Sequence, residues 1–238
     1  MATESHWERE AENWVRWART PGLDAYWDYG ASFFDHVVPM PGGLTLEVGC
    51  GEGRVARDLV NRGHRVVAVD SSRTLVSRAR DADRAGTYLV ADAAELPFPA
   101  AAFDLVVAYN SLMDVEDMPA AVAEAARVMS PRGRFCVCVS HPINDAGAFS
   151  DPGPDAEFLI SGTYFGRRPF EATVERDGLS MTFRGWCYAL GDYARALEAA
   201  GLAIELLREP TPADVSGQNR RARWRRVPMF LHLRCRRL

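Results

Sequence analysis

A glycine-rich turn with an acid in front of it is the part of this sequence best suited to chemistry. Glycine occupies three alternate positions, Gly49, Gly51 and Gly53, and Glu47 lies two residues before the first of them. Glycine allows a sharp turn and lets a ligand approach the backbone closely. A helix that begins just after the turn would point free N–H groups at that ligand. Residues 44–53 therefore predict a strand, a ligand-binding turn and the start of a helix.

A second acid follows at the end of the next apolar run. Residues 66–69 are apolar, and Asp70 closes the run 17 residues after Gly53. A carboxylate in this place can accept hydrogen bonds from the hydroxyls of a ribose. The nicotinamide and flavin fingerprint needs its third glycine where this chain has Arg54, so the spacing argues against a dinucleotide. The pattern predicts another nucleoside-bearing cofactor, with an unrelated glycine turn as the alternative.

Two polar pairs follow the third and fourth expected strands. Asp92 and Ala93 come after the third, where a carboxylate and a backbone N–H could bind an adenine ring. Asn110 and Ser111 come after the fourth, at the sheet edge where open α/β folds bind ligands. The alternative for each residue is a turn or a helix cap.

Together these four motifs resemble, in order and spacing, the class I S-adenosylmethionine-dependent methyltransferases, and within them the type 11 branch that includes quinone-biosynthesis enzymes. The resemblance covers about residues 40–140. It implies S-adenosyl-L-methionine as the cofactor and methyl transfer to a small molecule, at oxygen, nitrogen or carbon, as the reaction. The cofactor contacts that we expect are Tyr26, Glu47, Gly49, Cys50, Gly51, Gly53, Asp70, Ser71, Asp92, Ala93, Asn110 and Ser111.

Strands that alternate with helical patterns must position these residues. This alternation predicts an α/β fold with a parallel, doubly wound sheet. The resemblance implies a Rossmann-like sheet of seven strands with the last one antiparallel. The expected strands are residues 44–48, 66–69, 88–90, 104–108, 134–139, 203–207 and 229–234.

We expect a single domain over residues 1–238 with four segments. They are an N-terminal helical lid (1–40), a cofactor-binding core (41–140), a substrate-side insertion (141–190), and a C-terminal helix with the last two strands (191–238). The lid holds four of the six tryptophans, and an aromatic lid could keep water from a reactive sulfonium. Ordinary helix packing is the alternative.

His141 is the candidate general base, because it directly follows the fifth expected strand at the ligand edge. A turn histidine bonded to the backbone, with catalysis by proximity alone, is the alternative. The substrate contacts that we expect come from the lid, the insertion and the C-terminal arginine cluster. They are Trp27, Tyr29, Phe33, His141, Trp186 and Arg223.

The composition of the chain limits which other partners we expect, namely membranes, metals and nucleic acids. The chain has no apolar run of membrane-spanning length and a polar N-terminus, so we expect a cytoplasmic protein. The five cysteines form no C-x-x-C pair, so we expect no metal site. A cluster of five arginines in residues 220–226 could bind a carboxylate or phosphate. We expect no nucleic-acid partner; an RNA methyltransferase that uses this cluster, or a regulator that binds the cofactor without catalysis, is the rival hypothesis.

Overall fold

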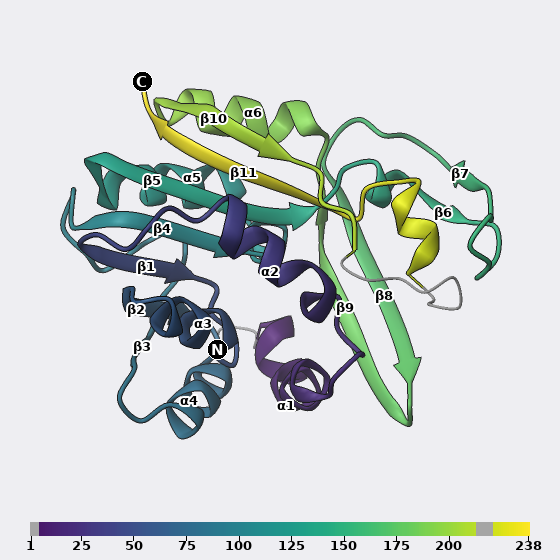
Figure 1. The fold of residues 1–238 in the computed structure, drawn as a ribbon, viewed down its shortest axis with the longest axis horizontal. Coiled ribbons are helices and arrows are strands. Elements are labelled where there is room, and N and C mark those ends of the chain that lie inside the picture. Colours follow the sequence, from purple (N-terminus) through teal and green to yellow (C-terminus); the bar gives the residue numbers. More distant parts are fainter. Residues whose placement is uncertain (1–4, 213–220) are drawn as a thin grey trace.

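The computed structural model describes residues 5–212 and 221–238. Arg220 of the predicted arginine cluster lies outside the described residues. A seven-stranded sheet in the order β10-β11-β5-β4-β1-β2-β3 forms the centre of the molecule (Figure 1). Its strands are β1 (Leu44–Val48), β2 (Arg65–Asp70), β3 (Thr87–Val90), β4 (Phe103–Tyr109), β5 (Met129–Ser140), β10 (Leu202–Arg208) and β11 (Phe230–Arg237).

The direction of the strands confirms the predicted fold class. Strands β1 to β5 pair in parallel, and β11 runs antiparallel to both β5 and β10. Strand β1 has β2 on one side and β4 on the other, so the chain reverses its direction of winding there. In such sheets the crevice at the carboxyl ends of the strands is the ligand site. Every predicted cofactor motif follows one of these strands.

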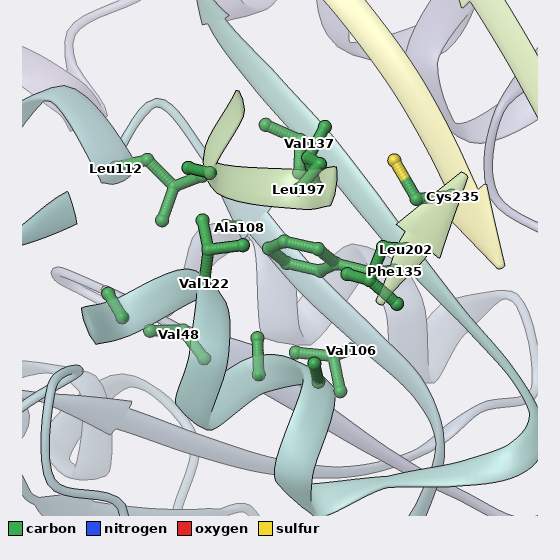
Figure 2. Close-up of a cluster of buried hydrophobic side chains, with 14 of the residues drawn as sticks. Val48, Val106, Ala108, Leu112, Val122, Phe135, Val137, Leu197, Leu202 and Cys235 are labelled. Atoms are coloured by element: carbon green, nitrogen blue, oxygen red, sulfur yellow. The ribbon is translucent and has the colours of Figure 1, made fainter. Parts of the chain in front are cut away.

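Helices cover both faces of the sheet. The first face carries α2 (Tyr26–His36), α3 (Arg54–Asn61) and α4 (Arg73–Ala82), and the second carries α5 (Met118–Val128) and α6 (Leu190–Ala199). The core on the second face is continuous. Phe135 of β5 and Val106 of β4 pack there with Val122 of α5 and Leu197 of α6 (Figure 2). Burial on both faces explains why the strands are almost uniformly apolar.

The insertion after β5 forms two small antiparallel ribbons. The first joins β6 (Gly147–Phe149) to β7 (Phe158–Ile160), and the second joins β8 (Arg168–Arg176) to β9 (Leu179–Cys187). Asp177 and Gly178 both have positive φ angles of 50° and 77°, as the tight turn of the second hairpin requires. Helix α1 (His6–Arg19) lies between this hairpin and α4 (Figure 1).

Strand β5 is longer than predicted. It begins at Met129 and so includes Pro131 to Gly133, which lie before the predicted strand 134–139. The pairing moves from Phe103↔Met129 to Leu105↔Arg134, so the extra residues form a bulge. A bulge tolerates a proline that cannot donate a ladder hydrogen bond. Among the described residues, no helix is both long and apolar enough to cross a membrane.

Candidate functional site

The loop after β1 adopts backbone conformations that favour glycine. Gly49, Gly51 and Gly53 have φ angles of +75°, +54° and +84°. The N–H groups of Gly49 and Cys50 donate to the carbonyl of Val69 at 2.8 and 2.9 Å, which ties the loop to β2. Residues that carry a side chain rarely adopt these backbone conformations. The three glycines are therefore needed for the shape of the loop as well as for ligand access.

Asp70 joins this loop to the start of α4. Its Oδ2 accepts the N–H of Gly51 at 2.8 Å, and its Oδ1 accepts the N–H of Ser72 at 2.9 Å. Burial raises the pKa of Asp70, and the two hydrogen bonds oppose that rise. An ionised carboxylate has about four acceptor positions, so each oxygen keeps one for a ligand hydroxyl. Ser71, beside it, is exposed.

Glu47 is a buried acid with a free oxygen. The residue is 1% exposed, and its Oε2 has no hydrogen-bond partner among the described residues. Burial and the nearby Asp70 carboxylate raise the pKa of Glu47 well above its usual range, while Arg57 opposes them. A buried carboxylate oxygen without a partner is costly. A ligand ammonium would satisfy it, and Glu47 is one of the predicted cofactor contacts.

The residues after β3 lie at the same edge of the sheet, but they are less enclosed. Asp92 is exposed, and its Oδ1 accepts the N–H of Ala94 at 2.8 Å. Ala93 is half-buried. The carboxylate of Asp92 therefore stabilises a turn, which is the alternative role named above for this residue. Its second oxygen can still accept a hydrogen bond from a ligand.

The residues after β4 contact the glycine loop directly. Ser111 donates its hydroxyl to the carbonyl of Val48 at 2.7 Å. A Cβ on Gly49 would lie only 2.3 Å from the Cβ of Ser111, so the two segments are in close contact. Asn110 has a positive φ of 51°, and its Oδ1 accepts the thiol of Cys138 at 3.3 Å. A strained non-glycine residue of this kind is common at ligand sites.

Helix α1 covers the glycine loop, which the sequence analysis did not predict in detail. The indole Nε1 of Trp14 lies 3.1 Å from the position that a Cβ on Gly51 would take. Glu8 accepts hydrogen bonds from the hydroxyls of Ser72 and Thr74, the latter at 2.7 Å. The only sequence signal for this contact was the density of tryptophans in the first 40 residues.

Two ion pairs attach the middle of the lid to the loop and to the start of α3. Arg19 of α1 pairs at 2.8 Å with Glu52, which is buried within the loop. Arg54, the first residue of α3, forms an ion pair with Asp24 between α1 and α2. The lid is thus fastened to the loop by charge as well as by aromatic packing.

The predicted aromatic contacts from α2 are mostly core residues. Tyr29 and Phe33 are 0% exposed and pack against Phe230 and Tyr109 of the sheet. Their helix face packs on the sheet, so a contact of these two residues with substrate stays a prediction. Trp27 lies on the other face and is 53% exposed.

Tyr26 is also buried, although it lies closer to the loop. Its hydroxyl donates to Asp58, and its ring lies 4.2 Å from the guanidinium of Arg54. These contacts join Tyr26 to α3, and a direct cofactor contact stays a prediction.

His141 lies at the carboxyl end of β5, as predicted. Its Nδ1 accepts the N–H of Ile143 at 3.1 Å, which places the ring proton on Nε2, 3.0 Å from Glu209. Burial lowers the pKa of His141, and Glu209 opposes that change. Both nitrogens are engaged, so His141 would have to give up one of these contacts to act as a base.

The remaining predicted contacts lie in and around the insertion. Trp186 stacks under the guanidinium of Arg167, 3.5 Å from its ring centre. Arg223 donates to the carbonyl of Asp151 at 2.8 Å and lies over the ring of Phe149. These arginines hold protein segments together. Trp186 is partly buried against the core and Arg223 lies against the insertion, so their contact with substrate stays a prediction.

The sequence of the core matches a known family. Residues 46–137 match the family described as Methyltransferase domain. The aklanonic acid methyltransferase of Streptomyces sp. (strain C5) is 28% identical over 76% of this chain and 84% of its own length. The nocamycin O-methyltransferase of Saccharothrix syringae is 37% identical over 48% of this chain. The chain spans 44% of that relative, and 36% of a malonyl-[acyl-carrier protein] O-methyltransferase from Serratia marcescens.

Solved structures extend the likeness to almost the whole chain. An S-adenosylmethionine-dependent methyltransferase from Mesorhizobium loti is 27% identical, with a TM-score of 0.70 over 90% of this chain and 98% of that one. A second structure, from Listeria monocytogenes, has a TM-score of 0.73 at 18% identity and supports the fold alone. The likeness therefore extends well beyond residues 46–137.

Proposed function

We propose that this chain, whose residues 46–137 are a methyltransferase domain of the class I, type 11 branch, transfers a methyl group from S-adenosyl-L-methionine to a small-molecule acceptor. One observation carries the proposal. The glycine loop, Asp70 and the unpartnered oxygen of Glu47 meet at one sheet edge, where each can take a different part of that cofactor.

Each of these groups fits a different cofactor moiety. The remaining acceptor positions of Asp70 suit the ribose hydroxyls, and the free Oε2 of Glu47 suits the ammonium. The bound cofactor would supply an electrophilic methyl group. The chain would align the acceptor with it and exclude water, and Trp14 over Gly51 gives the lid that this requires.

Oxygen is the acceptor atom that the relatives favour. Both the nocamycin and the malonyl-[acyl-carrier protein] relatives are named as O-methyltransferases. The RNA hypothesis receives less support, because the guanidinium groups of Arg221 and Arg226 pair with Asp28 and with the carbonyl of Ala156. The oxygen acceptor therefore leads, and an RNA acceptor is one outcome of the transfer experiment below.

Cofactor binding tests the proposal directly. We expect S-adenosylmethionine and S-adenosylhomocysteine to bind with micromolar affinity in isothermal titration calorimetry. Asp70→Ala should weaken both by about 10- to 100-fold, because hydrogen bonds to a charged group are lost. Asp81→Ala, which removes an exposed acid from α4, is the matched control and should leave both affinities unchanged. Equal affinities for wild type and Asp70→Ala would remove Asp70 from the site.

Transfer of a labelled methyl group identifies the acceptor class. The protein is incubated with methyl-labelled S-adenosylmethionine and an extract of its source organism, and small molecules, RNA and protein are then separated. Label in the small-molecule fraction supports the proposal. Label in RNA supports the rival acceptor, and cofactor binding without any transfer supports a non-catalytic regulator.

A further inference from the structure

Asp114 is an acid that no motif singled out, yet it lies beside the glycine loop. It ends the short helix η1 (Leu112–Asp114) that follows β4. Its N–H donates to the carbonyl of Ser111 at 3.0 Å, and Ser111 in turn contacts Gly49 and Val48. One helical turn therefore separates Asp114 from the loop expected to hold the cofactor.

The insertion encloses this carboxylate from the other side. A Cβ on Gly185 of β9 would lie 2.7 Å from Oδ1 of Asp114 and 2.7 Å from the carbonyl oxygen of Met113. Only a glycine lets β9 approach η1 so closely. The Asp114 carboxylate is thereby enclosed between the cofactor-binding core and the substrate-side insertion.

Asp114 lacks the partners that the neighbouring acids have. Asp70 accepts two backbone N–H groups, Asp145 accepts the Ser140 hydroxyl, and Asp117 accepts the N–H of Ala120. Asp114 accepts no hydrogen bond from any residue that the structure describes. A half-buried carboxylate with no hydrogen-bond partner among the described residues has its acceptor positions free for a ligand.

We propose that Asp114 is a catalytic residue, whose carboxylate faces the point of methyl transfer and takes the proton that the acceptor's hydroxyl loses. The inference rests on the proposed function. The acceptor's oxygen lone pair forms the new C–O bond, the C–S electron pair stays on sulfur, and the O–H proton moves to Asp114, which then releases it to solvent.

The electrostatics suit this role. Burial, together with the carboxylates of Asp70 and Asp145, holds the pKa of Asp114 well above its usual range. A carboxylate with a raised pKa is a better proton acceptor near neutral pH. His141 would be the competing base, but both of its ring nitrogens are already engaged.

Two cofactor forms test the position of Asp114 without a known acceptor. S-adenosylmethionine and S-adenosylhomocysteine differ by a methyl group and one positive charge. A carboxylate at the point of transfer favours the cation. We expect Asp114→Asn to reduce the preference for S-adenosylmethionine over S-adenosylhomocysteine, the ratio of their two Kd values, by about 5- to 10-fold.

Asp117→Asn is the matched control, because it removes the same charge three residues away and keeps a good helix cap. It should leave the ratio unchanged, and Asp114→Ser is a second variant in case Asp114→Asn does not fold. An unchanged ratio in both Asp114 variants, with wild type binding both compounds, overturns the role of Asp114 alone. Failure of wild type to bind either compound overturns the proposed function and this inference with it.

Transfer to the acceptor found in the labelling experiment gives the second readout. Asp114→Asn should lower kcat by about 100-fold or more, and Asp114→Glu should recover part of it. Full activity in Asp114→Asn contradicts the role as proton acceptor.

Discussion

At the scale of single residues, Asp145 illustrates the cost of a buried acid in the insertion. Its carboxylate accepts the Ser140 hydroxyl at 2.6 Å. Burial raises the pKa of Asp145 from 3.8 to about 6, although Ser140 and Arg168 oppose the rise. The folded state thus holds the proton more tightly than the unfolded state. Its contribution to stability is complete below 3.8 and is lost as the pH rises through about 6.

Asp145→Asn should therefore stabilise the protein at neutral pH. The amide carbonyl can still accept the Ser140 hydroxyl, and no charge is buried. We expect the free energy of unfolding at pH 7.5 to rise by about 1–3 kcal/mol, with a clearly smaller gain at pH 4.5, as measured by urea denaturation. Asp155→Asn, an exposed acid in the same insertion, is the control. A gain that does not vary with pH contradicts this explanation.

Some site residues could be predicted from the sequence and others could not, depending on whether a local sequence pattern marks them. Gly49 and Gly51 were predictable because a loop with positive φ angles at fixed spacing has few alternatives to glycine. The burial of Tyr29 and Phe33 was not predictable, because a helical pattern shows that a helix has two faces but not which one meets the sheet. Asp114 had no signal at all: its importance comes from Gly185, 71 residues away in the sequence.

At the scale of elements, α1 acts as a lid over the glycine loop. Trp14 lies on Gly51, and Glu8 and Arg19 attach the helix to α4 and to the loop. We expect the proposed cofactor to lie beneath this helix and to leave when the helix moves. The lid should therefore control the rate of release.

Trp14→Ala should accelerate the release of S-adenosylmethionine by about tenfold, because changes of this kind act mainly on the dissociation rate. Stopped-flow displacement of bound cofactor by excess S-adenosylhomocysteine measures that rate. Trp27→Ala removes an indole from the exposed face of α2 and should leave the rate unchanged. Equal dissociation rates for the two variants would show that α1 does not restrict the cofactor.

Most elements were predictable, because their patterns are local. Strand β1 has its predicted bounds, and the Asp177-Gly178 turn joins β8 to β9 as expected. The additional residues of β5 join the strand through a bulge against β4. A bulge leaves no periodic pattern in the sequence, so this extension could not be predicted. The position of α1 depends on contacts with β9, which lies more than 150 residues further along the chain.

At the scale of the whole molecule, the lid and the insertion form one cover. Trp17 of α1 and Leu23 are buried with Met181 of β9, and Trp14 packs against this cluster while lying on the glycine loop. The opposite side of α1 contacts α4 (Figure 1). The substrate-side hairpin therefore supports the helix that closes the cofactor site, so changes in one should affect the other.

Met181→Ala tests this connection, because the residue is 0% exposed and contacts the lid rather than the cofactor loop. We expect the free energy of unfolding to fall by about 2–5 kcal/mol. We also expect S-adenosylmethionine to bind several-fold more weakly in calorimetry, since α1 loses support on its hairpin side. Leu197→Ala, in the core beneath α6 (Figure 2), should lower stability similarly and leave cofactor affinity unchanged. If both variants bind the cofactor as tightly as wild type does, the hairpin and the lid are independent, and the acceptor-side insertion has no influence on closure over the glycine loop.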